Sequence, residues 1–564
     1  MHMVMEDFRD HLLKSLFIEK KLNEEDVEKQ KNMSIEEKVE NNLLLVGATI
    51  KSHQDDVYEL IVLDNYSKLR VGDKVTLKDE NSSSKYVATI IDIFFDTITI
   101  SCDKELESTT TYSIEQNSPE LLQTLISCLE GIYSGVPGAA FLRLLSGEEK
   151  FELVDFLKVP VEDVPQFENI KTQLNNEQLD AVRSMLQYPP IHVLQGPPGT
   201  GKTMVLAATA IATARMNREV VIIANTHHAV NNALQKIRSL DSKVTLIKVG
   251  AELKSEELDE TILKFEKFSE YYEYSYKNRK KKKTGHIIGM TIWGAITYLG
   301  LRHHAHFRPY ISLVDEASLM PLSLATILGK TAPSVCLFGD SIQMPPIFRP
   351  ELEKDEYSIS ILDYCATKVS DVPISVLHTT YRMNEDITTV VSKNFYEPYG
   401  IKLISSDFSK NRTLQLPCFE NEKFQDSITF VPSTDLDNCE DYNPAEAVDV
   451  ANFVHTLLEQ GMNQEDIAVI TPFRRQVRAL RECANDIIGD CSQLLIDTVE
   501  RLQGQDVECI ILSFAATDLD YIEARKGFLF NPNRLNVMIS RAKSKVIIFA
   551  SKELKCYINN LFIK

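Results

Sequence analysis

The sequence contains little cysteine, glycine, proline and tryptophan for its length. Its 564 residues include 10 Cys, 21 Gly, 21 Pro and one Trp, and 44% are hydrophobic and 25% charged. The cysteines form no Cys-x-x-Cys pair, which argues against a zinc cluster or a dense disulfide framework and favours free thiols in a reducing compartment. The low glycine and proline contents exclude collagen-like and low-complexity chains. What remains is the composition of a globular protein with roughly three or four domains.

Long apolar runs and a positive net charge are also missing. The longest apolar runs, such as 546–550 and 90–95, are too short to span a bilayer and are flanked or, as by Asp92, interrupted by polar residues. The first residues have mixed charge and lack the apolar centre of a signal peptide, so we expect no membrane association and a cytoplasmic location, with the nucleus as an alternative. The chain has 61 Lys and Arg against 81 Asp and Glu, a formal net charge of −20. Any surface that binds phosphates must therefore be a local basic patch.

The patterning of the first 170 residues predicts three segments. Residues 1–40 are highly charged with sparse apolar positions, which predicts an N-terminal helical segment. Residues 41–110 change to five short β-branched runs separated by polar turns, and this spacing predicts a small β-barrel accessory domain. Residues 111–170 are expected to form a helical stalk or linker.

From residue 171 onwards, strand-like apolar runs alternate with helical patterns. The alternation predicts an α/β fold with two tandem parallel-sheet domains, at 171–370 and 371–564. Aromatic and aliphatic residues at helical spacing interrupt the first domain, and we expect an inserted helical unit at about 245–287. The expected strands lie at 191–195, 220–224, 311–314, 335–338, 428–431, 468–471, 494–496, 509–513 and 546–549.

Residues 196–203 read Gly-Pro-Pro-Gly-Thr-Gly-Lys-Thr and fit the phosphate-loop pattern, with a strand expected before them and a helix after them. The alternative is a plain Gly/Pro turn. Glycines let successive backbone N–H groups point at an anion, and a helix N-terminus adds partial positive charge. Lys202 can reach the terminal phosphates of a nucleotide, and the Thr203 hydroxyl can hold Mg²⁺. The expected nucleotide contacts here are Gly196, Pro197, Gly199, Thr200, Gly201, Lys202 and Thr203.

Two adjacent carboxylates, Asp315 and Glu316, directly follow the expected strand at 311–314. A carboxylate at the end of a buried strand can face a phosphate loop and hold the metal, which is the role expected of Asp315. Its neighbour Glu316 can orient and deprotonate an attacking water. An Asp-Glu pair alone is a weak signal, and its place downstream of a phosphate loop is what favours this hypothesis.

Further motifs follow in order, and together they resemble the superfamily 1B helicases, in particular the group typified by the nonsense-mediated-decay RNA helicase. The resemblance covers roughly residues 174–550. Its motifs are Leu-Asn-Asn-Glu-Gln at 174–178, Gly-Asp-Ser-Ile-Gln-Met-Pro-Pro at 339–346, Tyr-Arg-Met at 381–383, Asn-Pro-Ala-Glu-Ala at 443–447, Thr-Val-Glu-Arg-Leu-Gln-Gly-Gln-Asp at 498–506 and Asn-Arg-Leu-Asn-Val-Met-Ile-Ser-Arg-Ala-Lys at 533–543. It implies two tandem RecA-like P-loop domains that bind ATP between them, and an ATP hydrolase and helicase activity.

The resemblance also implies roles for individual residues. Gln178 would read the adenine, Tyr381 would stack on it, and Asp506, where the family commonly has Glu, would contact the ribose. The alternative for Tyr381 is packing in the core. By resemblance, Arg382 and Arg541 are the two arginines that contact the phosphates, and Arg534 is a further candidate. The catalytic residues that the resemblance implies are Lys202, Glu316, Gln343, Arg382 and Arg541.

Helicases of this kind hold single strands through backbone contacts and base stacking. By resemblance, the nucleic-acid contacts are Thr226, Thr291, Thr498 and Gln503. His227 and Asn231 replace the family's usual Asn and Asp, and neither is counted among the expected contacts. The basic run at 277–283 is either a clamp on nucleic acid or a solvated loop, and Trp293 either stacks on a base or packs in the core.

We therefore expect an ATP-dependent, Mg²⁺-requiring helicase or translocase that moves 5′ to 3′ on single-stranded RNA or DNA. The alternative is a nucleic-acid-stimulated ATPase that acts as a clamp or nucleoprotein remodeller without unwinding, and a third, weaker hypothesis is a protein–protein switch that binds no nucleic acid. The motor is expected to be monomeric, with protein regulators acting through the N-terminal segment or the barrel.

Overall fold

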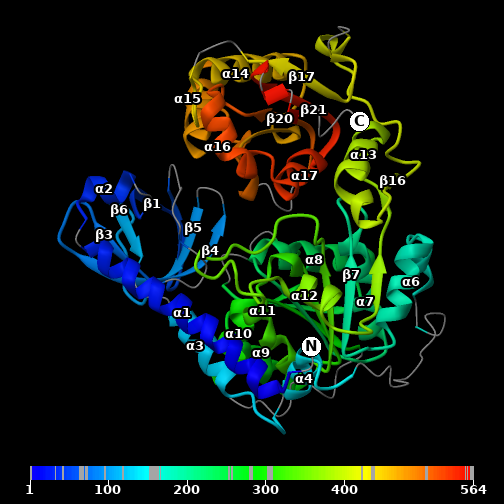
Figure 1. Cartoon of the computed structure of the whole chain (residues 1–564). Helices are drawn as coiled ribbons and strands as arrows, with labels where there is room; N and C mark the ends of the chain where they lie inside the picture. Colours follow the sequence, from blue (N-terminus) through cyan, green and yellow to red (C-terminus); the bar gives the residue numbers. More distant parts are fainter. Residues whose placement is uncertain are drawn as a thin grey trace. The chain divides into compact units, whose positions relative to one another are not determined.

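The fold is described from a computed structural model of the whole chain (Figure 1). The structure describes residues 3–558 apart from 32, 41–42, 63–68, 70–73, 95–96, 117–119, 137, 151–163, 165–166, 252–254, 256–257, 279–283, 302–308, 421–423, 434–437, 502–505, 553 and 556. These residues form two units, and each is described by itself. None of the described helices is both long enough and apolar enough to cross a membrane.

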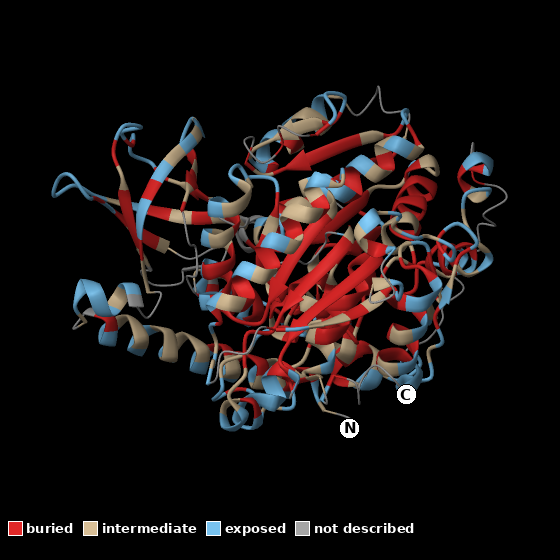
Figure 2. Ribbon diagram, turned by 90° about the horizontal axis from the view of Figure 1, so that it is seen from above, coloured by how far each residue is buried: buried red, intermediate tan, exposed pale blue. Residues whose placement is uncertain are grey.

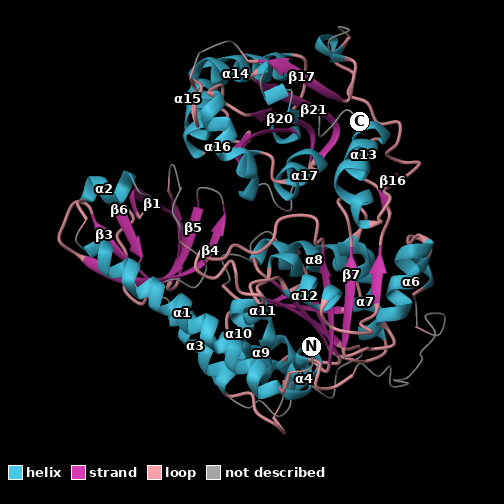
Figure 3. Ribbon diagram, viewed as in Figure 1, coloured by secondary structure: helices cyan, strands magenta, loops and turns pink. Residues whose placement is uncertain are grey.

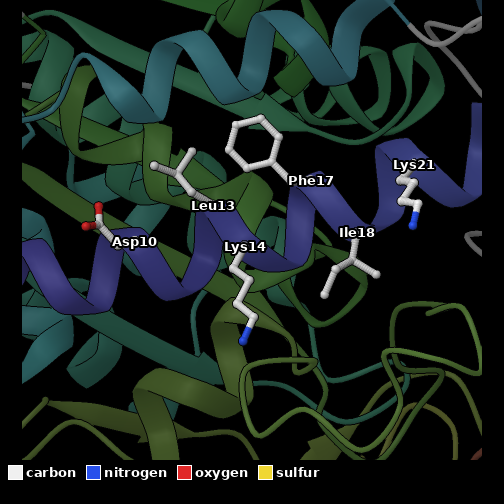
Figure 4. A pocket seen from close by; sticks show the side chains of 6 residues that line it. All are labelled: Asp10, Leu13, Lys14, Phe17, Ile18 and Lys21. Atoms are coloured by element: carbon white, nitrogen blue, oxygen red, sulfur yellow. The ribbon is translucent and has the colours of Figure 1, made fainter.

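A long helix, α1, opens the first unit. Met5, Phe8, Leu12 and Leu16 recur at helical spacing and are buried, because one face of α1 packs against α3 and α4. Another face carries Leu13, Phe17 and Ile18 among charged residues, and Figure 4 shows these side chains lining a shallow pocket along the helix. The helices of this region are α1 (Met5–Lys31), α2 (Ile35–Glu40), α3 (Glu120–Glu130) and α4 (Ala139–Ser146).

Six antiparallel strands form a closed barrel in the order β1-β2-β5-β4-β3-β6. The sequence predicted five strands within residues 41–110, and the structure adds a sixth, β6, at Tyr112–Gln116, which lies in the segment expected to form a helical stalk or linker. β6 pairs with both β1 and β3, so it closes the barrel and leaves no open edge. The other strands are β1 (Leu44–Gln54), β2 (Val57–Ile61), β3 (Lys74–Asp79), β4 (Lys85–Phe94) and β5 (Thr97–Ser101).

The first unit also contains an eight-stranded parallel sheet, in the order β10-β9-β11-β8-β12-β13-β7-β14. Strands of this sheet are drawn in magenta around the β7 label in Figure 3. Its central strands are buried along their whole length, which suits their mostly apolar sequences (Figure 2). The strands are β7 (Ile191–Gln195), β8 (Val220–Ala224), β9 (Thr245–Val249), β10 (Leu263–Phe265), β11 (His286–Thr291), β12 (Ile311–Val314), β13 (Ser334–Gly339) and β14 (Ile374–Val376). The helices are α5 (Glu168–Lys171), α6 (Asn176–Met185), α7 (Lys202–Arg215), α8 (His227–Leu240), α9 (Phe268–Asn278), α10 (Ile292–Leu301), α11 (Leu322–Ala325) and α12 (Ile361–Thr367).

Two expectations about this sheet need correction. The segment at about 245–287 is not a purely helical insertion, because β9 and β10 extend the sheet and only α9 is helical among its described residues. The helical spacing of its aromatic residues was misleading, since it runs from a strand into the following helix. The domain boundary near 370 is also displaced, because β14 pairs with β7 and the first unit extends to Val376.

The second unit has a five-stranded parallel sheet in the order β17-β21-β20-β18-β19. It comprises Leu377–Lys564 together with two short segments, Gly196–Gly201 and Asp340–Met344. The strands of this unit are β15 (Thr379–Thr380), β16 (Ile404–Ser405), β17 (Ile428–Pro432), β18 (Ile467–Thr471), β19 (Leu495–Thr498), β20 (Val507–Ser513) and β21 (Ala542–Ala550). Its helices are α13 (Glu385–Val391), α14 (Pro444–Glu459), α15 (Arg474–Ile488), α16 (Leu519–Leu529) and α17 (Pro532–Ser540).

Candidate nucleotide site

The phosphate loop follows β7 and precedes α7, as the motif requires. Gly199 and Gly201 have φ angles of +71° and +87°, which glycine adopts without steric penalty. A Cβ atom on Gly199 would lie 2.4 Å from the Cβ of Arg382 and 2.6 Å from the Oγ1 of Thr380, so no other residue fits there. Lys202 begins α7, whose N-terminal N–H groups favour an anion.

Asp315 and Glu316 occupy the turn directly after β12. The Asp315 amide donates to the Ile223 carbonyl at 2.8 Å, and the Glu316 amide donates to the Asp315 carboxylate at 3.0 Å. Glu316 has φ 53° and ψ 39°, a left-handed conformation that is uncommon outside glycine and is often found at functional sites. The turn therefore holds the two carboxylates next to each other at the end of a buried strand.

Asp315 is buried beside a second carboxylate. Burial and, to a smaller extent, the neighbouring charge of Glu316 raise its pKa to about 7, while Lys202 opposes the shift. A hard divalent cation prefers oxygen ligands, and it would compensate the like charges of this pair. The donor chemistry therefore fits the Mg²⁺ site expected at Asp315 and Thr203.

A buried polar network surrounds Gln343 in the second unit. Arg541, the C-cap residue of α17, donates from Nη2 to Gln343 Oε1 at 3.0 Å. Gln343 in turn donates from Nε2 to Asp340 Oδ2 at 2.7 Å. Arg541, Gln343 and Asp340 are all buried, and hydrogen bonds between buried groups restrict the arrangements that these side chains can adopt.

Tyr396 and Asn536 complete this network, and Tyr396 was not among the residues singled out from the sequence. The Tyr396 hydroxyl donates to Asp340 Oδ2 at 2.6 Å, and Asn536 Nδ2 lies 2.9 Å from both Tyr396 Oη and the Ile342 carbonyl. Burial and the Asp340 charge raise the pKa of Tyr396, so the hydroxyl remains a donor. Asn536 lies within a recognised motif, but Tyr396 has no local signal because its partner Asp340 is 56 residues away.

Tyr381 and Arg382 contact the phosphate loop directly within the second unit. The Tyr381 amide donates to the Gly199 carbonyl at 2.8 Å, and the Tyr381 side chain is 37% exposed, which disfavours the alternative of a core tyrosine. Arg382 Nη1 donates to the Ser540 carbonyl at 3.1 Å, and its Nε lies 3.6 Å from Asp506 Oδ2. Asp506, expected to contact the ribose, therefore pairs with Arg382 here.

Gln178 lies at the third position of α6 and takes part in its N-terminal cap. Its backbone N–H donates to Asn175 Oδ1 at 2.8 Å, and its side-chain Oε1 accepts from the Asn175 amide at 3.1 Å. This reciprocal capping box orients the side-chain amide of Gln178, which is a buried residue. The adenine contact of Gln178 stays a prediction.

The expected nucleic-acid residues lie on separate elements. The Thr226 hydroxyl accepts from the Ala229 amide at 3.2 Å and caps α8, and the Thr291 hydroxyl accepts from the Gly294 amide at 3.1 Å at the start of α10. A hydroxyl that accepts in this way can still donate its hydrogen to a phosphate oxygen. Thr498 ends β19 and donates its amide to Asp497 at 2.7 Å. Gln503 lies outside the described residues.

The presence of His227 where the family usually has Asn has a structural reason. His227 is buried, and its Nδ1 lies 2.9 Å from Nζ of Lys248, which is itself fully buried on β9. Burial lowers the pKa of Lys248 to about 7, and Asp92 partly offsets this shift. His227 therefore has an internal partner rather than a position on the surface. Asn231 is also buried.

Three other candidates can be placed. Arg534 pairs with Glu500 at 2.6 Å and its guanidinium lies 3.9 Å from the centre of the Phe528 ring, so the structure gives it a packing role. Trp293 is partly buried and packs against the core of the first unit, as the core alternative expected. Lys277 pairs with Glu273 at 3.6 Å, and residues 279–283 of the basic run lie outside the described residues.

The Asn-Pro-Ala-Glu-Ala motif contributes a buried carboxylate at Glu446. It accepts hydrogen bonds from Ser433, from the Ser513 hydroxyl at 2.6 Å and from the Ala515 amide at 2.8 Å. Ala515 has a φ angle of +59°, which is strained for alanine. Burial raises the pKa of Glu446 from 4.5 to about 7. Glu446 thus holds the strained turn after β20.

Comparison with known proteins agrees with the motifs. Two family models described as AAA domains match residues 173–355 and 357–553. The DNA replication ATP-dependent helicase/nuclease dna2 of Schizosaccharomyces pombe is 26% identical over 405 residues, which are 67% of this chain and 28% of that protein. The DNA polymerase alpha-associated DNA helicase A of S. pombe is 25% identical and covers 69% of this chain and 65% of its own length. The DNA-binding protein SMUBP-2 of Mesocricetus auratus is 23% identical, with 87% of this chain and 54% of that protein covered.

A phosphate loop before a helix, a carboxylate pair after a parallel strand and two tandem parallel α/β sheets define a P-loop NTPase with two motor domains. The ordered motifs and the relatives specify it further. The two AAA-domain matches and these relatives support a place among the superfamily 1B helicases. It spans about 28% of the length of the first-named relative.

Proposed function

We propose that the chain is an ATP-dependent helicase or translocase that couples ATP hydrolysis to 5′–3′ movement along single-stranded nucleic acid. The observation that carries this proposal is the hydrogen bond of Arg541 to Gln343, in the unit where Tyr381 contacts the phosphate loop. This bond joins two of the ordered motifs, and the bond from Arg382 to the Ser540 carbonyl adds a third, which supports a shared response to the nucleotide.

The proposed hydrolysis uses the chain's own groups in distinct roles. Lys202 and the N–H groups of the phosphate loop bind the phosphates, and Glu316 orients the attacking water and accepts its proton. Thr203 and Asp315 would hold Mg²⁺, which when bound neutralises charge on the phosphate oxygens. These assignments rest on the motif positions and on the carboxylate pair after β12.

The cationic side chains complete the proposed mechanism. Arg382 and Arg541 would stabilise the charge that develops on the transferred phosphoryl group, and Gln343 would report the presence of the γ-phosphate. Tyr381 would stack on the adenine, which its partly exposed ring permits. Gln178 would read the adenine edge, and Asp506 would leave Arg382 for the ribose when nucleotide binds.

The proposed strand contacts are Thr226, Thr291, Thr498 and Gln503. The names of the relatives refer to DNA, so we propose single-stranded DNA as the first substrate to test, with RNA as the alternative. We further propose a monomeric motor, in the cytoplasm or nucleus, with protein regulators acting on the N-terminal segment or the barrel.

Strand-stimulated ATPase and unwinding assays on the purified chain test the proposal. We expect ATP hydrolysis to rise with single-stranded oligomers of matched DNA and RNA sequence, and a duplex with a 5′ tail to be separated. Stimulation without strand separation would instead support a clamp or nucleoprotein remodeller. No stimulation by either oligomer would contradict the proposal and favour a switch that acts on proteins alone.

A further inference from the structure

Residues 406–412 form a loop after β16 that holds the Tyr381–Arg382 segment. The Thr380 carbonyl accepts from the Ser406 amide at 2.9 Å and from the Ser409 hydroxyl at 3.1 Å. The Arg382 carbonyl accepts from Arg412 Nη1 at 2.6 Å. The peptide before Tyr381 and the peptide after Arg382 are therefore both fixed by one loop.

The 406–412 loop is itself braced from within its unit. The hydroxyls of Ser406 and Ser409 lie 3.0 Å apart, and Ser409 is fully buried. The Lys410 carbonyl accepts from the Glu385 amide at 3.1 Å, and the Arg412 carbonyl accepts from Asn384 Nδ2 at 3.1 Å. Glu385 and Asn384 begin and cap α13, so the loop is tied to the start of that helix.

The held segment is also bonded to the phosphate loop. The Thr380 hydroxyl donates to the Pro198 carbonyl at 2.9 Å, and the Tyr381 amide donates to the Gly199 carbonyl at 2.8 Å. A Cβ on Gly199 would collide with both Thr380 and Arg382, so the two segments are in close contact. A displacement of the 406–412 loop would therefore change how Tyr381 and Arg382 meet the phosphate loop.

We propose that Ser409 and Arg412 are positioning residues that set the placement of Tyr381 and Arg382 toward the nucleotide. The inference rests on the proposed ATP hydrolysis, and it concerns residues outside the recognised motifs. Neither side chain is assigned a nucleotide contact, and each acts through a backbone carbonyl. Arg412 makes a charge-assisted hydrogen bond, and the Phe408 ring lies 5.3 Å from its guanidinium, which orients the donor.

Substitutions of Arg412 and Ser409 should have different kinetic effects. Arg412 acts through Arg382, whose role is at the γ-phosphate, so Arg412→Ala should lower kcat by about tenfold, in line with the sensitivity of catalysis to misplaced groups. Ser409 acts through the peptide before Tyr381, whose role is at the base. Ser409→Ala should therefore raise the KM for ATP about threefold with little change in kcat.

The experiment compares the full chain with Arg412→Ala, Arg412→Lys, Ser409→Ala and Lys410→Ala in strand-stimulated ATPase assays, and measures affinities for ADP and for a non-hydrolysable ATP analogue. Lys410→Ala is the matched control, because its exposed side chain pairs only with Asp407 among the described contacts of the same loop. Arg412→Ala should weaken the ATP analogue about tenfold and ADP less than twofold, and Arg412→Lys should recover part of the loss. In an Arg382→Ala background, adding Arg412→Ala should change kcat less than twofold.

Two results would overturn the proposal. One is a tenfold loss of kcat when Arg412→Ala is added to the Arg382→Ala variant, and the other is an equal loss of affinity for ADP and for the ATP analogue in Arg412→Ala. Variants that match Lys410→Ala in every measurement would also overturn it. If Arg412→Ala fails to fold in a thermal melt, Arg412→Lys and Ser409→Ala carry the same comparison. A wild-type chain that hydrolyses no ATP would contradict the proposed function, whereas the analogue and ADP affinities would still test the positioning role.

Discussion

Arg541 donates a hydrogen bond from Nη2 to Oε1 of Gln343 at 3.0 Å, although 198 residues separate the two in sequence. Gln343 belongs to the motif after β13, and Arg541 belongs to the motif at the end of α17. Both side chains are buried, so the contact is shielded from competing water. Two motifs that are recognised independently in the sequence thus form one physical unit.

This contact predicts energetic coupling between the two residues. Gln343→Ala and Arg541→Ala should each lower kcat by about 10²-fold or more, because a cation at the transferring phosphoryl group is worth about 10³–10⁵ in rate. The kcat of the double variant should lie no more than about tenfold below that of the less active single variant, because each single change already breaks the shared contact. Steady-state ATPase rates measure this cycle, and fully multiplicative losses would contradict it.

Lys202→Ala and Glu316→Gln should both abolish turnover, for different reasons. Lys202→Ala removes a cation from the phosphates and should weaken ATP binding, whereas Glu316→Gln removes the proposed base and should leave binding intact. Fluorescent-nucleotide binding together with ATPase rates separates the two effects. Turnover at the wild-type rate in Glu316→Gln would refute the assignment of the base.

Gly199→Ala should impair ATP hydrolysis and stability together. The new Cβ would lie 2.4 Å from the Cβ of Arg382, and the φ angle of +71° adds strain of about 1–2 kcal/mol. Gly461→Ala is the matched control, because Gly461 also has a positive φ, +98°, but open space around it. Thermal melts and ATPase rates of the two variants isolate the collision from the strain, and equal behaviour would argue against close packing at Gly199.

The raised pKa of Glu446 should make the stability of the folded chain depend on pH. Its pKa is raised from 4.5 to about 7 in the folded chain, so the folded state retains a proton that the unfolded state has lost between these values. The stabilisation is therefore complete below about pH 4.5 and is lost as the pH rises through about 7. Glu446→Gln keeps the shape and an acceptor for the Ala515 amide, and it should reduce this pH dependence by about 1–3 kcal/mol. Denaturant titrations of wild type and variant between pH 5 and 8 measure the difference, and parallel curves would contradict it.

Strand binding should weaken as salt concentration rises. The chain has a formal net charge of −20, so its affinity for a strand must come from local contacts with phosphates. For single strands, the slope of log K against log salt should be about −0.7 for each phosphate neutralised. Fluorescence anisotropy of a labelled oligomer at several salt concentrations gives this slope, and a flat response would exclude backbone tracking.

The sequence alone determined the parallel α/β class, the phosphate loop and the order of the motifs. These features are local: an apolar run, a glycine pattern and a helix start need only neighbouring residues, and the strand predictions at 191–195, 220–224 and 311–314 match β7, β8 and β12. The barrel was found in outline for the same reason, but its sixth strand was missed.

Tertiary structure decided which distant residues meet. β6 is recognisable only by its pairing with β1 and β3, and β9 and β10 only by their pairing within the large parallel sheet, in which β10 is an edge strand. Tyr396, Ser409 and Arg412 carry no motif, because their partners are backbone or side-chain groups tens of residues away. Local pattern specifies elements and their chemistry, whereas hydrogen bonds between remote segments depend on packing that no short stretch of sequence encodes.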